Sequence, residues 1–211
     1  MNESKQPPEL RHQVVGPLSL NSYAVVCSRT RHSLLIDPGD EPRKLTAMLG
    51  DSLVQAIVVT HGHPDHIGAL PEMQARLDVP VMAFGGEAAP RVDRTLRHGD
   101  FIPFGRHQLK VFHAPGHRPD QICLGIDGDL RYIVGDTIFE GGPGKTWSAG
   151  DFKQTLKTLR SIVLAWPDDA VCFPGHGPSF RLGDIRNRIE SFLAREHGDF
   201  FGDAVWEKGN P

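Results

Sequence analysis

Histidine and aspartate are concentrated in one short stretch of the 211-residue sequence, Thr60-His61-Gly62-His63-Pro64-Asp65-His66. Imidazole and carboxylate are the groups with which proteins bind zinc, iron and manganese. Side chains two residues apart in an extended loop point the same way, so we expect His61 and His63 to bind one ion. Asp65 and His66 are offset and could serve a second ion. The alternative, a helix-capping loop that is histidine-rich by chance, fits this spacing poorly.

Three further candidate ligands occur later, each directly after a glycine and near the end of a predicted strand. They are His117 in Ala114-Pro115-Gly116-His117, Asp136 in Val134-Gly135-Asp136-Thr137 and His176 in Phe173-Pro174-Gly175-His176-Gly177. Glycine lets the backbone approach an ion closely. An isolated histidine or aspartate in a loop is usually solvated or caps a turn, but with the first motif these residues make a dinuclear site. His113, by contrast, is expected to pack at a strand end.

The elements that must position these residues are short strands that alternate with helices. Apolar, β-branched runs predict strands at 14–15, 23–27, 34–36, 56–59, 79–84, 108–113, 122–126, 132–134 and 170–173. Helical spacing of apolar residues predicts helices at 41–49, 67–77, 152–164 and 185–193. Several strands followed by a helix occur twice, which predicts two packed sheets with helices outside them.

The composition is typical of a soluble globular protein, with 39% hydrophobic and 23% charged residues and a net charge of -3. This charge does not favour a nucleic-acid partner. No apolar run reaches the roughly 20 residues that span a bilayer, and no secretory signal is recognised. Cys27, Cys123 and Cys172 lie in apolar runs, which predicts buried free thiols and a cytoplasmic protein.

The motif HxHxDH, followed by a histidine, an aspartate and a histidine, resembles the metallo-β-lactamase fold superfamily over about residues 14–193. The resemblance implies an α/β fold, an αβ/βα sandwich of two mixed β-sheets with helices on the outer faces. It also implies one metallo-hydrolase domain over residues 1–211, without a separate C-terminal helical domain. The implied cofactors are two divalent metal ions, zinc in the first place, with iron or manganese as alternatives.

The resemblance assigns the ligands as well. The first metal would be held by His61, His63 and His117, the second by Asp65, His66 and His176, and Asp136 would bridge both. Two divalent ions make hydroxide available near neutral pH, and Asp65 and Asp136 would act in catalysis by balancing charge and orienting it. Asp37 and Thr60 are candidates for orienting the ligand imidazoles; the alternative is a turn residue and a strand-end residue.

Asp136 and the loop after it favour the glyoxalase II (hydroxyacylglutathione hydrolase)-like branch, because zinc β-lactamases typically replace this aspartate. The loop Gly144-Lys145-Thr146-Trp147 resembles the glyoxalase II loop in which a lysine, and a tyrosine two positions later, contact glutathione. Lys145 matches the lysine, and Trp147 stands where the tyrosine would be. Both are therefore candidate substrate-binding residues. The alternative is a solvated lysine and a packing tryptophan.

Long glyoxalase II enzymes add a helical domain whose basic residues hold glutathione, whereas here Arg186, Arg188 and Arg195 are expected to form a solvated helix face. We expect a metal-dependent hydrolase of small thioesters such as S-lactoylglutathione, without nucleic-acid or membrane partners. The alternatives are a mono-iron persulfide dioxygenase, a lactone or phosphoester hydrolase on the same scaffold, and a binding module with a structural metal. Open coordination positions argue against the last.

Overall fold

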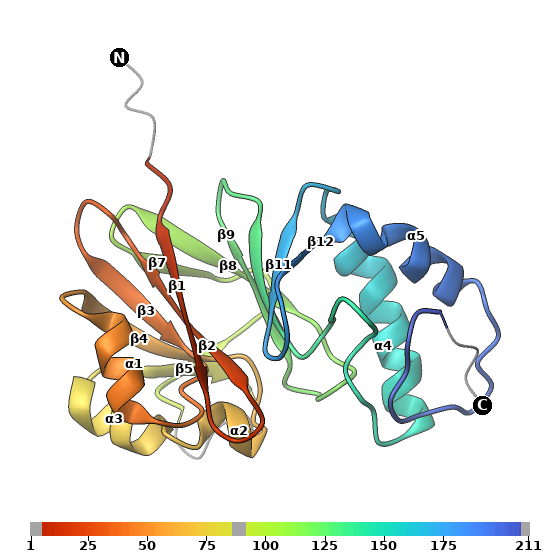
Figure 1. Ribbon diagram of the computed structural model, residues 1–211, viewed down its shortest axis with the longest axis horizontal. Helices are drawn as coiled ribbons and strands as arrows, with labels where there is room; N and C mark the ends of the chain where they lie inside the picture. Colours follow the sequence, from red (N-terminus) through yellow and green to blue (C-terminus); the bar gives the residue numbers. More distant parts are fainter. Residues whose placement is uncertain (1–5, 86–91, 208–211) are drawn as a thin grey trace.

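Two six-stranded mixed sheets pack face to face in the computed structural model, which describes residues 6–85 and 92–207 (Figure 1). The first sheet contains, in spatial order, β1 (Glu9–Val15), β2 (Leu20–Val26), β3 (His32–Ile36), β4 (Leu53–Val59), β5 (Val81–Phe84) and β6 (Arg94–Leu96). The second contains, in spatial order, β12 (Phe180–Arg181), β11 (Val171–Pro174), β10 (Arg131–Gly135), β9 (Ile122–Ile126), β8 (His107–His113) and β7 (Phe101–Phe104).

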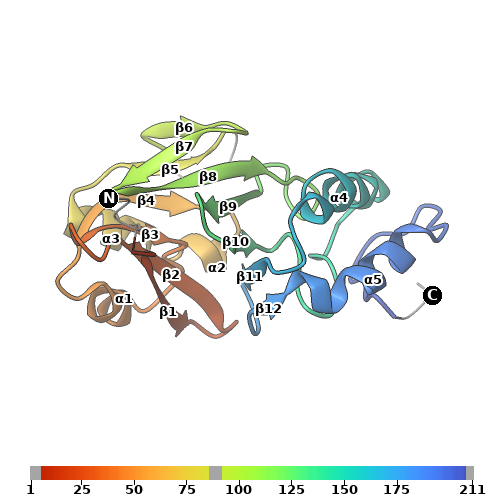
Figure 2. The same cartoon turned by 90° about the horizontal axis from the view of Figure 1, so that it is seen from above.

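Helices cover the outer faces of both sheets (Figure 2). The helices beside the first sheet are α1 (Pro42–Leu49), α2 (Pro64–Ile67) and α3 (Leu70–Leu77). Those beside the second are α4 (Ala149–Ser161), the 3₁₀ turn η1 (Val163–Ala165) and α5 (Leu182–Leu193). The predicted αβ/βα sandwich of two mixed sheets is therefore confirmed.

The inner strands are apolar on both faces because each sheet lies between its helices and the other sheet. Successive side chains of a strand point to opposite faces. In β2, Val25 faces the core between the sheets, whereas Ala24 and Val26 face the core under α1 and α3. In β9, Leu124 lies in the core between the sheets, and Cys123 lies in the core under α4 and α5. This double burial explains why these strands read as continuous apolar runs.

The two sheets are joined by hydrogen bonds at the edge where β10 and β11 end. These strands run parallel, so their C-terminal ends lie side by side. From β2 of the first sheet, the Tyr23 hydroxyl donates to the Pro174 carbonyl at 2.7 Å, and Asn21 Nδ2 donates to the same carbonyl at 2.9 Å. The Asn21 backbone N–H also donates to the Gly175 carbonyl at 2.7 Å. These contacts fix the relative position of the loops that follow β10 and β11.

Two predicted helices differ from those observed. The helix expected over 67–77 is divided between α2 and α3, because the chain at Gly68 packs against the loop after β3. A Cβ at Gly68 would lie only 2.4 Å from the Gly39 carbonyl oxygen. The helix expected over 152–164 begins earlier, at Ala149, where the Ser148 hydroxyl accepts the Asp151 N–H, and its last turn is the separate η1.

Three short strands, β6, β7 and β12, were not predicted, because two to four residues are too few to show a period of two. The three cysteines are buried and free, as expected. Across residues 6–85 and 92–207 no helix has the length and apolar character needed to cross a membrane.

The chain returns after α5, and its segment 199–206, here called the C-terminal strap, lies against the loop of residues 136–148, the β10–α4 loop. The Thr146 N–H donates to the Gly202 carbonyl at 3.1 Å, and the Gly202 N–H donates to the Thr146 hydroxyl at 3.2 Å. The buried Trp206 donates its indole N–H to the Glu140 carbonyl at 3.0 Å. The strap therefore fixes the β10–α4 loop by hydrogen bonds at Glu140 and Thr146.

Candidate metal centre

All seven predicted metal-ligating residues meet at the edge where the two sheets join. They lie on four segments: the loop and short helix after β4, the loop before β9, the loop after β10 and the loop after β11. The strand β4 leads into the histidine motif, and the short helix α2 then carries Asp65 and His66. Their possible ligand atoms form three groups in which all atoms lie within 4.8 Å of one another. The groups are His61, His63 and His117; His61, His66 and Asp136; and Asp65, His66 and His176.

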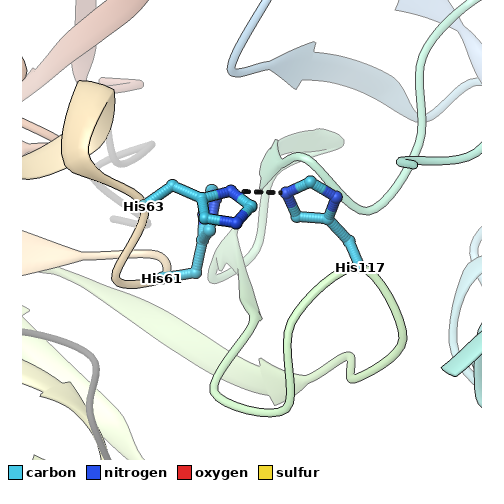
Figure 3. Close-up of side chains that lie close together, drawn as sticks. All are labelled: His61, His63 and His117. Carbon is cyan, nitrogen blue, oxygen red and sulfur yellow. Dashed lines mark hydrogen bonds between the residues drawn. The ribbon is translucent and has the colours of Figure 1, made fainter. Parts of the chain in front are cut away.

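The first group brings three imidazoles together from two facing loops (Figure 3). The Nδ1 atom of His63 lies 3.0 Å from His61 Nε2 and 2.9 Å from His117 Nε2. Two nitrogens bound to one tetrahedral zinc ion at about 2.0–2.1 Å lie about 3.4 Å apart. The three nitrogens therefore need to move by only a few tenths of an ångström to bind one ion.

Asp65, His66 and His176 are here called the second group, and the carboxylate of Asp136 joins them to the first group. His176 Nε2 lies 3.1 Å from Asp65 Oδ2, and His66 Nε2 lies 4.0 Å from the same oxygen. Asp136 Oδ2 lies 3.6 Å from both His117 Nε2 and His176 Nε2, and Asp136 Oδ1 lies 3.4 Å from His66 Nε2. One carboxylate thus faces nitrogen atoms of both groups, which is the arrangement expected of a bridging ligand.

Two atoms in the middle of the centre fit a cation. In the described part of the chain, His66 Nε2 and Asp136 Oδ1 are buried and face each other at 3.4 Å without the geometry of a hydrogen bond. Buried polar atoms without a partner are rare and cost free energy. A divalent ion placed between a neutral imidazole nitrogen and a carboxylate oxygen would satisfy both atoms. The residues present therefore fit the divalent metal that the motif implies.

The imidazoles of the first group are neutral at pH 7, as metal binding requires. Burial lowers the pKa of His61 well below its ordinary value. Burial lowers the pKa of His63 to about 4, and this ring is further disfavoured as a cation beside His117, because two adjacent imidazoles do not both hold a proton, and beside the charged Arg118. Burial also lowers the pKa of His117, although Asp136 acts in the opposite direction. Their ring nitrogens are therefore available as ligands without loss of a proton.

The second group favours positive charge. The hydrogen bond from His176 lowers the pKa of Asp65 to about 2, against the effect of burial. Burial alone would lower the pKa of His66, but the carboxylates of Asp37 and Asp136 raise it to about 10. The two buried carboxylates thus hold a positive charge strongly at this position, and a divalent ion supplies such a charge as well.

Asp37 lies in the position predicted for a residue that orients a ligand imidazole. Its side chain is buried, and Asp37 Oδ2 lies 2.9 Å from His66 Nδ1. The same carboxylate accepts the Thr60 N–H and the Thr60 hydroxyl, both at 2.7 Å, and the Thr60 hydroxyl lies 3.2 Å from His61 Nδ1. One carboxylate therefore fixes rings of both groups, which directs their Nε2 atoms toward the centre.

Backbone carbonyls fix two other rings. His117 Nδ1 lies 2.8 Å from the Lys145 carbonyl, and His176 Nδ1 lies 3.0 Å from the Leu18 carbonyl. Each contact places the Nδ1 proton on the ring, so that Nε2 faces the metal groups as an acceptor. These two positions could not be predicted from the sequence, because every residue carries a backbone carbonyl and the residue type gives no signal.

Asp120 is a further residue that the sequence analysis did not identify. It is buried, and its Oδ2 atom accepts the N–H of Gly62, in the middle of the histidine motif, at 2.8 Å. Its Oδ1 atom accepts Nε of Arg118 at 3.2 Å. Asp120 therefore ties the loop that carries His61 and His63 to the loop that carries His117. Its position three residues after His117 is the one feature that could have singled it out.

Two glycines leave space that the centre needs. A Cβ at Gly175 would lie 2.2 Å from Asp136 Oδ1, and a Cβ at Gly144 would lie 2.0 Å from the Asp136 carbonyl oxygen. Side chains at either position would displace Asp136 or His117. This agrees with the prediction that glycines beside the ligands allow close approach of the backbone.

The two predicted substrate-binding residues differ in position. The Trp147 ring lies 5.2 Å from the His63 ring and 5.3 Å from the His117 ring, between centroids, and is 52% exposed. Lys145 Nζ lies 3.1 Å from Asp203 Oδ2 in the C-terminal strap, and both side chains are exposed. Trp147 therefore borders the metal centre directly, whereas the ammonium of Lys145 pairs with the strap.

One expectation about basic residues was wrong. Arg186 is not part of a solvated helix face, because it donates to the carbonyls of Leu164 and Trp166 at 3.0 and 2.5 Å and is only 19% exposed. It fixes the turn between α4 and β11. His113 does pack at a strand end, as expected, and its ring stacks on Phe84 at 3.8 Å between centroids.

Comparison with known proteins identifies the class that this fold and these ligands define. The family model described as "Metallo-beta-lactamase superfamily" matches residues 15–176. The chain therefore belongs to the metallo-β-lactamase superfamily, and within it resembles metal-dependent hydrolases of the hydroxyacylglutathione hydrolase type.

Three similar proteins illustrate this position in the family. The "Probable metallo-hydrolase YqgX" of Bacillus subtilis is 30% identical, over 80% of this chain and 90% of the relative. A hydroxyacylglutathione hydrolase of a Polaromonas species is 32% identical, over 83% of this chain and 66% of the relative. The crystal structure of ETHE1 from Myxococcus xanthus has a TM-score of 0.80 and 23% identity, over 89% and 86% of the two chains, and shows the shared fold.

Metal titration should give a stoichiometry of about two divalent ions per chain, because two groups of three proposed ligands are assembled and Asp136 lies between them. The measurement is elemental analysis after equilibration with zinc, manganese or iron and removal of free metal. His176→Ala, which affects only the second group, should reduce the ratio to about one. A preparation that binds a single ion under all three metals would contradict the two-ion assignment.

Proposed function

We propose that the protein is a dinuclear metal-dependent hydrolase that cleaves small thioesters, such as S-lactoylglutathione. The observation that carries this proposal is the position of Asp136, whose carboxylate lies 3.6 Å from nitrogen atoms of His117 and His176, one from each group. The 32% identity to a hydroxyacylglutathione hydrolase supports the substrate class. Both ligand groups are present, and a cavity lined by Trp147 borders His63 and His117 of the first group.

The proposed roles follow from the contacts. His61, His63 and His117 would hold one ion, Asp65, His66 and His176 the other, and Asp136 both. Two divalent ions there would supply an acidified water and polarise the thioester carbonyl.

Asp65 would orient the attacking water, because part of its carboxylate is exposed to solvent. The Asp65 side chain is 25% exposed, and its Oδ2 atom lies 3.1 Å from His176 Nε2, the atom beside which the second ion would bind. The carboxylate can therefore accept a hydrogen bond from the attacking water and orient that water toward the carbonyl carbon.

Lys145 and Trp147 would bind the thiol carrier, which is the thiol part of the thioester, such as glutathione. Trp147 borders the first group and is half exposed, so its ring can cover an apolar part of the carrier. The Lys145–Asp203 ion pair is exposed, and such pairs contribute only about 0–1 kcal/mol. A substrate carboxylate can therefore replace Asp203 as the partner of Lys145 at little cost.

Lys145→Ala is expected to raise KM for S-lactoylglutathione about 3- to 10-fold and to change kcat less. A carboxylate remote from the reacting carbon is bound about equally in the ground and transition states. Steady-state kinetics with metal-loaded protein measure both constants. The matched control is Lys153→Ala, which removes a different ion pair of the strap, Lys153 Nζ to Asp199 Oδ1 at 2.9 Å. An equal change of KM in both variants would contradict a substrate contact of Lys145.

The main alternative function is a mono-iron persulfide dioxygenase, which would use His61, His63, His117 and Asp136. The assembled second group, with His176 Nε2 3.1 Å from Asp65 Oδ2, favours the dinuclear hydrolase. A panel of glutathione and coenzyme A thioesters, lactones, phosphodiesters and glutathione persulfide distinguishes the two, with oxygen consumption recorded for the last. Metal-loaded protein that cleaves no thioester but opens lactones or consumes oxygen would overturn the proposal.

A further inference from the structure

A cavity of about 340 Å³ opens beside the first ligand group, on the side of Trp147. Its walls are formed by His63, His117, Arg118, Pro119, Trp147 and Asp151. Arg118 and Asp151 bring opposite charges to this cavity, and neither residue belongs to the proposed set of metal ligands. A volume of this size is at the lower end of small-molecule sites and is sufficient for one amino-acid moiety.

Arg118 is held at one nitrogen. Its Nε atom donates to Asp120 Oδ1 at 3.2 Å, and the buried Asp120 is itself fixed by the Gly62 N–H at 2.8 Å. Within residues 6–85 and 92–207, the two terminal nitrogens of Arg118 have no protein acceptor. A guanidinium with an open edge of two N–H donors matches the two oxygens of a carboxylate.

Asp151 is held at one oxygen in a similar way. It lies in the first turn of α4, and its Oδ2 atom accepts the Ser148 hydroxyl at 2.7 Å. No lysine, arginine or histidine of the described chain forms an ion pair with it, Arg118 included. Two opposite charges that border one cavity without contacting each other can each bind the complementary charge of a single ligand.

We propose that this cavity binds the zwitterionic amino-acid end of the thiol carrier, with its α-carboxylate on Arg118 and its α-ammonium on Asp151. This inference rests on the proposed thioester hydrolysis and specifies its substrate class. The cavity reaches the metal centre directly, because His63 and His117 are part of its lining, and the Trp147 ring lies 5.3 Å from the His117 ring between centroids. A carrier of this kind can therefore fill the cavity while its acyl group extends past these two histidines toward the ligand groups.

The subsite predicts a charge preference. Carriers that end in phosphates bring only negative charge, which Arg118 attracts and Asp151 repels. Carriers with a free α-amino group and an α-carboxylate satisfy both side chains. Acetylation of that amino group should therefore weaken binding, and the effect should depend on Asp151.

Isothermal titration of the metal-loaded protein with S-methylglutathione tests the subsite without hydrolysis. Arg118→Gln is expected to raise Kd about tenfold or more, because a hydrogen-bonded charge pair is lost. Asp151→Asn keeps the acceptor for Ser148 but removes the charge, and should raise Kd several-fold. The matched control is Arg188→Gln on α5, where Arg188 pairs with Glu207 and lies outside the cavity lining.

A second ligand, S-methylglutathione acetylated at its α-amino group, separates a charge contact from a structural role. Wild-type protein should bind the acetylated ligand several-fold more weakly than the free amine, and Asp151→Asn should lose this difference. Retention of the full difference in Asp151→Asn would overturn the assignment of Asp151. Arg118→Gln with wild-type metal content and weaker binding supports the subsite, whereas wild-type metal content with a wild-type Kd overturns it. If Arg118→Gln also loses metal through Asp120, the wild-type protein decides: S-methylglutathione with its γ-glutamyl α-carboxylate converted to the amide should bind about tenfold more weakly than the free acid, and equal binding overturns the subsite.

The failure of this inference differs from a failure of the proposed function. Protein that hydrolyses a neutral thioester of N-acetylcysteamine but does not bind S-methylglutathione would overturn the subsite and leave the hydrolase. Protein that shows the expected charge dependence in the titration but cleaves no thioester would overturn the hydrolase and leave the subsite.

Discussion

Asp136→Ala is expected to abolish turnover and to lower the affinity for both ions. Its carboxylate faces His117 and His176 through Oδ2, at 3.6 Å each, and His66 through Oδ1, at 3.4 Å. A residue that only orients a ligand costs roughly 10- to 100-fold in affinity or activity when it is removed, and the loss here should be larger. Metal content by elemental analysis and kcat/KM for a thioester measure the two effects.

Asp129→Ala provides a matched control for Asp136→Ala. Asp129 is partly buried and hydrogen-bonded to Arg131, but it lies in the turn before β10 and outside the three ligand groups. Its removal should leave the metal content unchanged. If Asp136→Ala retained two ions and a near-normal rate, Asp136 could not be the bridging ligand.

Asp37→Ala should have the second-largest effect, on both stability and metal binding. The Asp37 carboxylate is buried and contacts His66 Nδ1, the Thr60 hydroxyl and the Thr60 N–H. Its removal leaves buried donors without acceptors, and breaking a buried charged network typically costs about 3–5 kcal/mol. We expect the free energy of unfolding to fall by roughly this amount, and the affinity of the second site to fall about 10- to 100-fold.

Urea denaturation and metal titration measure these two losses separately. Asp37→Asn is the matched variant, because it keeps the shape and one acceptor oxygen but removes the charge. It should lose less stability than Asp37→Ala while metal affinity still decreases. An Asp37→Ala protein with wild-type stability and wild-type metal affinity would show that the observed hydrogen bonds are incidental.

The seven proposed ligands could be found in the sequence because their side chains are chemically distinctive and four of them are close together. His61 and His66 also follow a strand that is buried on both faces, and such a strand is visible as a continuous apolar run. The distant His117, Asp136 and His176 were found because each follows a glycine at a strand end. Their meeting at one edge required the two-sheet architecture that the alternation of strands and helices predicted.

Other features had no signal in residue types. The carbonyls of Lys145 and Leu18 orient two ligand rings, and any residue could supply a carbonyl there. The pairing of Lys145 with Asp203 joins loops that are distant in sequence and depends on where the strap lies after α5. Strands of two to four residues, such as β6 and β12, are defined by their neighbours in the sheet and not by their own pattern.

The C-terminal strap limits how the β10–α4 loop can be exchanged between related proteins. The buried Trp206 binds the Glu140 carbonyl, the Thr146 N–H binds the Gly202 carbonyl, and a Cβ at Gly142 would lie 2.1 Å from the Ala204 carbonyl oxygen. A chimera that receives a loop of another length or path would lose these contacts, and the carbonyl at position 145 would no longer be held against the His117 ring. Exchange of this loop with its support intact therefore requires exchange of the strap as well.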